Sequence, residues 1–128
     1  MSTILIVEDN EKNMKLVRDI LQHKGYTTVE ATTGEEGWRL VQETLPDLVL
    51  MDIQLPDVDG ITVLRRIRAD SRFDAMPVVA VSASVMPADQ TKISGSGFDA
   101  FIPKPISLKP FMATVERYIQ GGRDRVPP

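Results

Sequence analysis

Five short runs rich in apolar and β-branched residues recur along the chain, each followed by polar residues. They are Thr3 to Val7, Thr27 to Ala31, Leu48 to Met51, Val78 to Val81 and Ala100 to Ile102. Short runs without sustained apolar and polar alternation are typical of strands buried on both faces of a parallel sheet, and the second run is the weakest of the five. The pattern therefore predicts five strands.

Between these runs, apolar residues recur at the three- and four-residue spacing of helices. The first helix has its expected apolar stripe at Met14, Val17 and Leu21, widened by Leu16 and Ile20. Later stripes consist of Gly37, Leu40 and Val41, of Val63, Leu64 and Ile67, and of Phe111, Met112, Val115 and Ile119. Thr33 with Glu36 three residues later predicts a capping box that opens the second helix. Helices therefore alternate with the strands.

One more helix is predicted between the fourth and fifth strands. It begins at Pro87, a residue that suits a first helical turn, and ends at about Ser94. Five strands alternating with five helices indicate an α/β fold: a doubly wound (βα)5 sandwich with right-handed crossovers and helices on both faces. We expect the flavodoxin-like strand order 2-1-3-4-5, which places a binding crevice beyond Val7 and Met51. Pro103 lacks a backbone donor, and this order gives its strand an edge position where that is tolerated.

Composition limits the class of protein. The 128 residues are 42% hydrophobic and 26% charged with a net charge of −3, values typical of one soluble domain with no attraction to nucleic acid. No apolar run approaches the roughly 20 residues that span a bilayer, the start resembles no secretory signal, and there is no cysteine. We therefore expect a cytoplasmic protein with a domain at 1–120 and a disordered tail at 121–128.

Acidic residues follow both strands that flank the predicted crevice. Glu8 and Asp9 come after the first strand, and Asp52 comes after the third. Three converging carboxylates would raise the pKa of at least one of them unless a cation lies between them. Oxygen ligands without nearby His or Cys favour Mg²⁺, with Mn²⁺ able to substitute. One acid at a strand end is an ordinary solvated residue, but the three together favour a metal site.

Ser82 and Lys104 belong to the same edge of the predicted sheet, because they follow the fourth and fifth strands. A hydroxyl can bond a phosphoryl oxygen, and an ammonium group can balance its charge. Each residue alone is unremarkable at a strand end. Combined with the three acids, the pair favours phosphoryl chemistry.

Four segments carry a resemblance to a known family. VEDN at 7–10, PDLVLMDIQLPDVDG at 46–60, AVSA at 80–83 and KP at 104–105 resemble the receiver domain of two-component response regulators. The similarity extends over the chain to about Ile119. It implies a single-domain switch of a phosphorelay that is phosphorylated on an aspartate and signals by binding other proteins.

The resemblance implies a role for each acid of the crevice. Asp52 would accept the phosphoryl group and, with Asp9, bind Mg²⁺. The main-chain carbonyl of Gln54 would be the third protein ligand. Glu8 would hold a metal-bound water.

The resemblance also implies how phosphorylation changes the protein. Ser82 and Lys104 would contact the phosphoryl group, and Phe101 would be an aromatic rotamer switch, although Phe101 can equally be an ordinary core residue of the fifth strand. The peptide bond before Pro105 is expected to be cis. Phe98 occupies a position where the family usually carries a small residue.

The family further implies the partners. A phosphohistidine of a histidine kinase or phosphotransfer protein would be the donor, and kinase or phosphatase regulators would bind the protein, with no contact to nucleic acid or membrane. The chain would catalyse its own phosphorylation and slow dephosphorylation without being a multiple-turnover enzyme. It would be a monomer, or a dimer through the helix at 87–94, the strand at 100–102 and the last helix.

Three other functions compete with this interpretation of the sequence. An FMN-binding module of the same architecture needs a donor-rich loop after the first strand, where Glu8 and Asp9 would repel a phosphate. A haloacid-dehalogenase-type phosphatase needs a second acid two residues after its nucleophile, where Gln54 stands. The complete set of polar residues disfavours a phosphorylation-incompetent scaffold, and only an assay decides that case.

Overall fold

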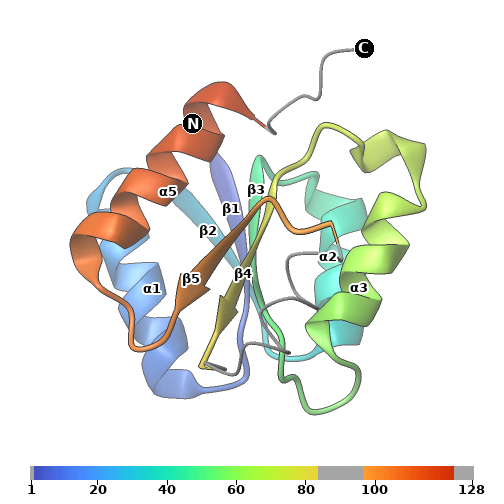
Figure 1. Ribbon diagram of the computed structural model, residues 1–128, viewed down its shortest axis with the longest axis horizontal. Helices are drawn as coiled ribbons and strands as arrows, with labels where there is room; N and C mark the ends of the chain where they lie inside the picture. Colours follow the sequence, from blue (N-terminus) through green and yellow to red (C-terminus); the bar gives the residue numbers. More distant parts are fainter. Residues whose placement is uncertain (1, 84–96, 123–128) are drawn as a thin grey trace.

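The computed structural model describes residues 2–83 and 97–122, which form a parallel sheet with helices on both faces (Figure 1). In chain order the elements are β1 (Thr3–Val7), α1 (Glu11–His23), β2 (Thr27–Ala31), α2 (Gly34–Thr44), β3 (Leu48–Asp52), α3 (Gly60–Arg68), the 3-10 helix η1 (Ser71–Phe73), β4 (Val78–Ser82), β5 (Ala100–Pro103) and α5 (Leu108–Gly121). The helix predicted at 87–94 and the tail beyond Gly122 lie outside the described residues. None of the described helices is long and apolar enough to cross a membrane.

The strand order is β2-β1-β3-β4-β5, and every neighbouring pair is parallel. The predicted order is therefore confirmed. Pro103 lies at the end of the edge strand β5, opposite Ser82, so its missing donor interrupts no ladder in the sheet interior. Val7 and Met51 are in register at the carboxyl ends of β1 and β3, which places the residues that follow them at one edge.

Burial of the strands explains the pattern of the sequence. All residues of β3 and β4 are buried, and β1 is buried after its first residue. A strand covered on both faces has no solvent-facing positions and reads as a continuous apolar run. The edge strand β2 is largely exposed or half-buried, which accounts for its weak signal.

Alternate side chains of the strands point into two cores. Helices α1 and α5 cover one face and α2 and α3 cover the other (Figure 1). The first core includes strand residues Ile4, Ile6, Leu48, Leu50, Val79, Val81 and Ile102. The second includes Leu5, Val7, Ala31, Val49, Met51 and Val78. The sheet is thus held on both sides, and its carboxyl edge is left as a rim of loops.

The apolar stripe of α1 is narrower than predicted. Met14, Val17 and Leu21 are buried, and Ile20 packs against the first core. Leu16 is 44% exposed, so the prediction that it widens the stripe is wrong. At 100° per residue Leu16 lies roughly 120° from the centre of the buried stripe, too far round the helix to reach the sheet.

The start of α2 matches the predicted capping box with one change. The Thr33 hydroxyl accepts the Glu36 N–H at 3.1 Å. The Glu36 carboxylate accepts the N–H of Thr32 at 3.1 Å, one residue before the N-cap. Two orphan donors at this helix start are therefore satisfied from within its own segment.

Candidate functional site

The sheet brings the three predicted acids together. Because β1 and β3 are parallel neighbours, Glu8 and Asp9 follow β1 at the point where Asp52 ends β3. One carboxylate oxygen from each of the three residues lies within 4.8 Å of the others. Glu8 and Asp52 are buried, whereas Asp9 is exposed. The cluster is thus open to solvent on one side only.

Lys104 joins the two buried acids. Its Nζ lies 2.7 Å from Glu8 Oε1 and 3.1 Å from Asp52 Oδ2, and its side chain is 14% exposed. The Lys104 N–H donates to the Ser82 carbonyl at 2.9 Å, which extends the β4–β5 pairing beyond the strands. The Lys104–Pro105 peptide bond, expected to be cis, is cis. Lys104 therefore crosses from the edge strand to the centre of the sheet.

The buried acids have shifted pKa values. Burial and the neighbouring Glu8 raise the pKa of Asp52 to about 7, against the opposing effect of Lys104. Burial would raise the pKa of Glu8, but hydrogen bonds with Asp52 and Lys104 outweigh it and lower the pKa. Burial likewise opposes charge on Lys104, yet the two carboxylates raise its pKa. Three acids facing one ammonium group leave the site short of positive charge.

The donor set suits a hard divalent cation. Glu8, Asp9 and Asp52 offer oxygen ligands only, and exposed Asp9 leaves room for the waters that Mg²⁺ retains. The Gln54 N–H donates to Asp52 Oδ1 at 3.2 Å, which places the main chain of Gln54 beside the acids. The role of its carbonyl as a ligand stays a prediction.

The other predicted residues lie on β4 and β5. Ser82 ends β4 next to β3 and is buried. Phe101 is half-buried and lies opposite Ala80 in the β4–β5 register. Phe98 is half-buried and packs against the second core. The roles of Ser82 and Phe101 in switching stay predictions.

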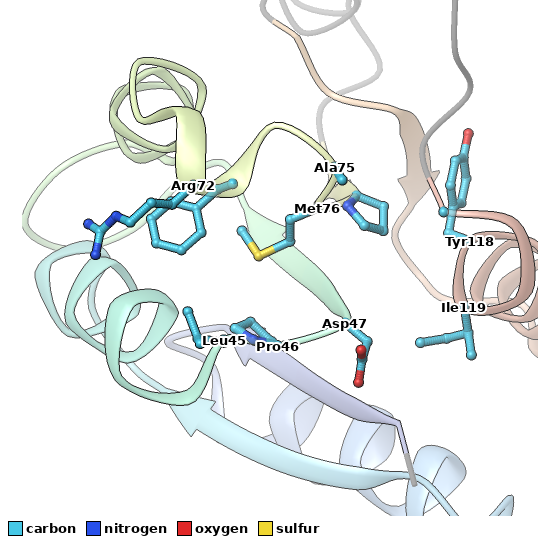
Figure 2. A pocket seen from close by; sticks show the side chains of 11 residues that line it. Leu45, Pro46, Asp47, Arg72, Ala75, Met76, Tyr118 and Ile119 are labelled. Atoms are coloured by element: carbon cyan, nitrogen blue, oxygen red, sulfur yellow. The ribbon is translucent and has the colours of Figure 1, made fainter.

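One hollow of the described residues lies away from this site. A cavity of about 400 Å³ lies at the opposite, amino edge of the sheet, and Figure 2 shows its side chains. Its charged groups are bound by neighbours: Asp47 accepts the Thr3 N–H at 2.8 Å, and Arg72 pairs with Asp70 at 2.6 Å. Without a cluster of acids this cavity does not suit phosphoryl chemistry. A groove of about 370 Å³ beside α1 instead reaches Glu8 and Asp9.

Gly60 is a site residue that the sequence analysis did not single out. Its N–H donates to the Ile53 carbonyl at 2.8 Å and closes the loop after β3. A Cβ at this position would overlap the carbonyl oxygen of Asp52. The Asp59–Gly60 pair is a turn signal that could have pointed to this close approach.

Gly60→Ala is expected to lower the free energy of unfolding by about 1–3 kcal/mol, because the added methyl group must displace the main chain of Asp52. Urea-induced unfolding measures this change. Gly121→Ala is the matched control, since a Cβ there meets nothing within 4 Å. Equal stability of the two variants would contradict the close approach.

Comparison with known proteins identifies the class. The sequence matches the response regulator receiver domain over residues 4–116, and the chain belongs to this family. It is 44% identical over 117 residues to the polar-differentiation response regulators DivK of Brucella ovis and Brucella anthropi, covering 91% of this chain and 95% of each relative. The segments at 7–16, 51–56 and 101–107 also resemble DivK.

Solved structures agree with this assignment. The signal receiver domain of a histidine kinase from Syntrophus aciditrophicus superposes with a TM-score of 0.89 at 30% identity, covering 94% of this chain and 92% of that one. The receiver domain of a sensor histidine kinase from Pseudomonas aeruginosa PAO1, with magnesium coordinated in its active site cleft, has a TM-score of 0.87 at 28% identity, with 94% and 98% covered. The fold is that of a receiver domain.

Proposed function

We propose that this chain is a single-domain response regulator of a phosphorelay, phosphorylated on Asp52 with Mg²⁺. The observation that carries the proposal is the meeting of three carboxylates and Lys104 at one edge of the sheet, with Nζ 2.7 and 3.1 Å from the two buried acids. Similarity to DivK over 95% of that regulator's length supports a protein that works without an attached effector domain.

The residues of the site divide the chemistry. Asp52 attacks the phosphorus of a phosphohistidine on the donor protein, so that a P–O bond forms, the P–N bond breaks and the imidazole leaves with the electron pair. Asp9, Asp52, the Gln54 carbonyl and, through water, Glu8 would hold Mg²⁺, which would supply positive charge for the phosphoryl oxygens, and Mn²⁺ could replace it. The raised pKa of Asp52 favours the neutral acid, and Lys104 counteracts this by stabilising the carboxylate.

The acyl phosphate formed on Asp52 is read through β4 and β5. Lys104 pairs with a phosphoryl oxygen, the Ser82 hydroxyl donates to another, and Phe101 turns inward to fill the space behind Ser82. Ser82 and Phe101 lie on adjacent strands, which supports a direct coupling between them. The altered surface then biases binding of partner proteins.

The partners are a histidine kinase or phosphotransfer protein and kinase or phosphatase regulators, encountered in the cytoplasm. A net charge of −3 disfavours nucleic acid as a partner. The protein is a monomer, or a dimer through β5, α5 and the helix predicted at 87–94. The name of the Brucella relatives supports a role in polar differentiation. The proposed role in cell-cycle or cell-division control rests on the resemblance to DivK. The protein turns over only its own phosphoryl group and is not a multiple-turnover enzyme.

Acetyl phosphate with Mg²⁺ is expected to add one phosphate per chain to the Asp52 peptide. The label should be lost on treatment with hydroxylamine, which cleaves acyl phosphates, and should not form in EDTA. Intact-mass and peptide mass spectrometry measure both. Labelling that resists hydroxylamine would contradict an acyl phosphate, and multiple turnover of p-nitrophenyl phosphate would favour the phosphatase alternative.

A further inference from the structure

The loop at 53–59 connects the proposed phospho-acceptor to α3 and is closed at both ends. It starts directly after Asp52, and the Gly60 N–H returns to the Ile53 carbonyl at 2.8 Å. At its far end Asp59 caps α3, accepting the Thr62 N–H at 2.8 Å. The position of its middle therefore depends on contacts outside the loop.

Asp57 provides that contact. Its Oδ1 accepts the Gly34 N–H at 2.8 Å and its Oδ2 accepts the Glu35 N–H at 2.9 Å. Both donors belong to the first turn of α2, where backbone N–H groups have no partner within the helix. These hydrogen bonds favour the charged carboxylate and lower the pKa of Asp57 to about 2. Because each oxygen has its own donor, the carboxylate has one orientation relative to α2.

The contact does more than cap a helix. Thr33 already caps α2 from within its own segment by accepting the Glu36 N–H at 3.1 Å. Next to Asp57, Val58 packs so closely on Gly34 that a Cβ at Gly34 would overlap its side chain. Two successive loop residues, one polar and one apolar, thus hold the loop against the start of α2.

We infer that Asp57 is a positioning residue of the metal and phosphoryl site, because its two hydrogen bonds to α2 hold the loop that carries Gln54. The Gln54 N–H donates to Asp52 Oδ1 at 3.2 Å, so the path of this loop sets the geometry next to the acceptor. The inference rests on the proposed function, in which the Gln54 carbonyl binds Mg²⁺. Outer groups that orient a ligand contribute strongly to metal affinity although they do not touch the metal.

Calorimetric titration with MgCl₂ alone tests the inference. Asp57→Ala is expected to raise the Mg²⁺ dissociation constant about tenfold, the low end for residues that orient a ligand. Asp57→Asn should lie between this variant and the wild type, because its amide oxygen can accept one of the two N–H groups. Gly34→Ala displaces Val58 from the α2 side and should weaken Mg²⁺ binding in the same direction.

Two control variants separate positioning from simpler effects. Thr33→Ala removes the cap of the same helix without touching the loop and should leave the Mg²⁺ dissociation constant unchanged. Glu35→Gln removes a negative charge from the same helical turn, where Glu35 pairs with Arg66 at 2.7 Å, and should change the constant less than twofold. Urea unfolding in EDTA checks that each variant is folded.

The outcomes are distinct. In one outcome, Asp57→Ala binds Mg²⁺ with the wild-type dissociation constant while its free energy of unfolding is lowered as in Thr33→Ala. That result would overturn the inference and show that Asp57 is only a helix cap. An equal loss of affinity in Glu35→Gln would overturn it in favour of general electrostatic attraction. If Asp57→Ala does not fold, Asp57→Asn and Gly34→Ala decide by the same criterion. Absence of Mg²⁺ binding by the wild type would instead reject the proposed function, and the inference with it.

Discussion

Asp52→Asn is expected to abolish phosphorylation by acetyl phosphate and, in EDTA at pH 8, to unfold with a free energy about 2 kcal/mol higher than that of the wild type. Burial and Glu8 raise the pKa of Asp52 from 3.8 to about 7. A rise of this size corresponds to at most about 4 kcal/mol of destabilisation once the folded carboxylate is ionised. We expect the amide to recover about half of it, because the site is open to water at Asp9 and solvent screens the unfavourable interaction of the carboxylate.

The pH dependence of this difference has a definite sign. Between about pH 4 and 7 folded Asp52 binds a proton that unfolded Asp52 has released, so the stability of the wild type falls as pH rises through this window. Asp52→Asn lacks this contribution. The stability gap should therefore be small near pH 4, grow up to pH 7 and stay constant above it. Glu8 has the opposite shift in pKa, caused in part by its hydrogen bond with Asp52, and the amide of Asp52→Asn can donate that hydrogen bond in its place.

Urea unfolding at pH 4, 6 and 8 in EDTA measures the gap. Mg²⁺ provides a second check, since it is expected to bind the folded wild type and thereby narrow the gap at pH 8. A gap that is the same at all three pH values would show that ionisation of Asp52 does not limit stability. Phosphate incorporation into Asp52→Asn would place the acceptor elsewhere.

Asp99→Ala is expected to lower the free energy of unfolding by about 3–5 kcal/mol. Asp99 Oδ2 accepts hydrogen bonds from Arg68 at 2.9 Å and from the Val78 N–H at 2.8 Å. The side chain of Arg68 is 16% exposed and that of Asp99 is 6% exposed. The substitution therefore leaves the Arg68 cation in a largely buried environment without this carboxylate. Arg68 also donates to the main chain of Phe73 and Met76, which ties α3 to the start of β4.

An exposed pair of similar geometry is the control. Arg39 and Glu43 on α2 lie 2.7 Å apart, but their side chains are 57% and 55% exposed. Glu43→Ala should cost no more than about 0.5 kcal/mol, because water screens the pair. Urea unfolding compares both variants with the wild type. Similar losses in the two would contradict the importance of burial for the Arg68–Asp99 pair.

Much of the site could be predicted from the order of elements along the chain. Alternating strands and helices require a parallel sheet, and adjacent parallel strands end at the same edge. Glu8, Asp9 and Asp52 could therefore be placed together once β1 and β3 were expected to be neighbours. The same reasoning placed Ser82 and Lys104 at that edge. Resemblance to the receiver family supplied the roles of these residues, which sheet topology alone does not provide.

Contacts between distant segments were decided only by the tertiary structure. Asp57 binds the start of α2 across 23 residues of sequence, and Tyr118 donates to the Asp99 carbonyl at 2.7 Å across 19. Periodicity indicates which side of an element is apolar relative to its own axis. The prediction for Leu16 was wrong because the width of the buried stripe depends on how α1 lies on the sheet. The pKa of Asp52 likewise depends on its burial and on the distances to Glu8 and Lys104. Those quantities arise from packing between elements, which a local pattern of residues does not encode.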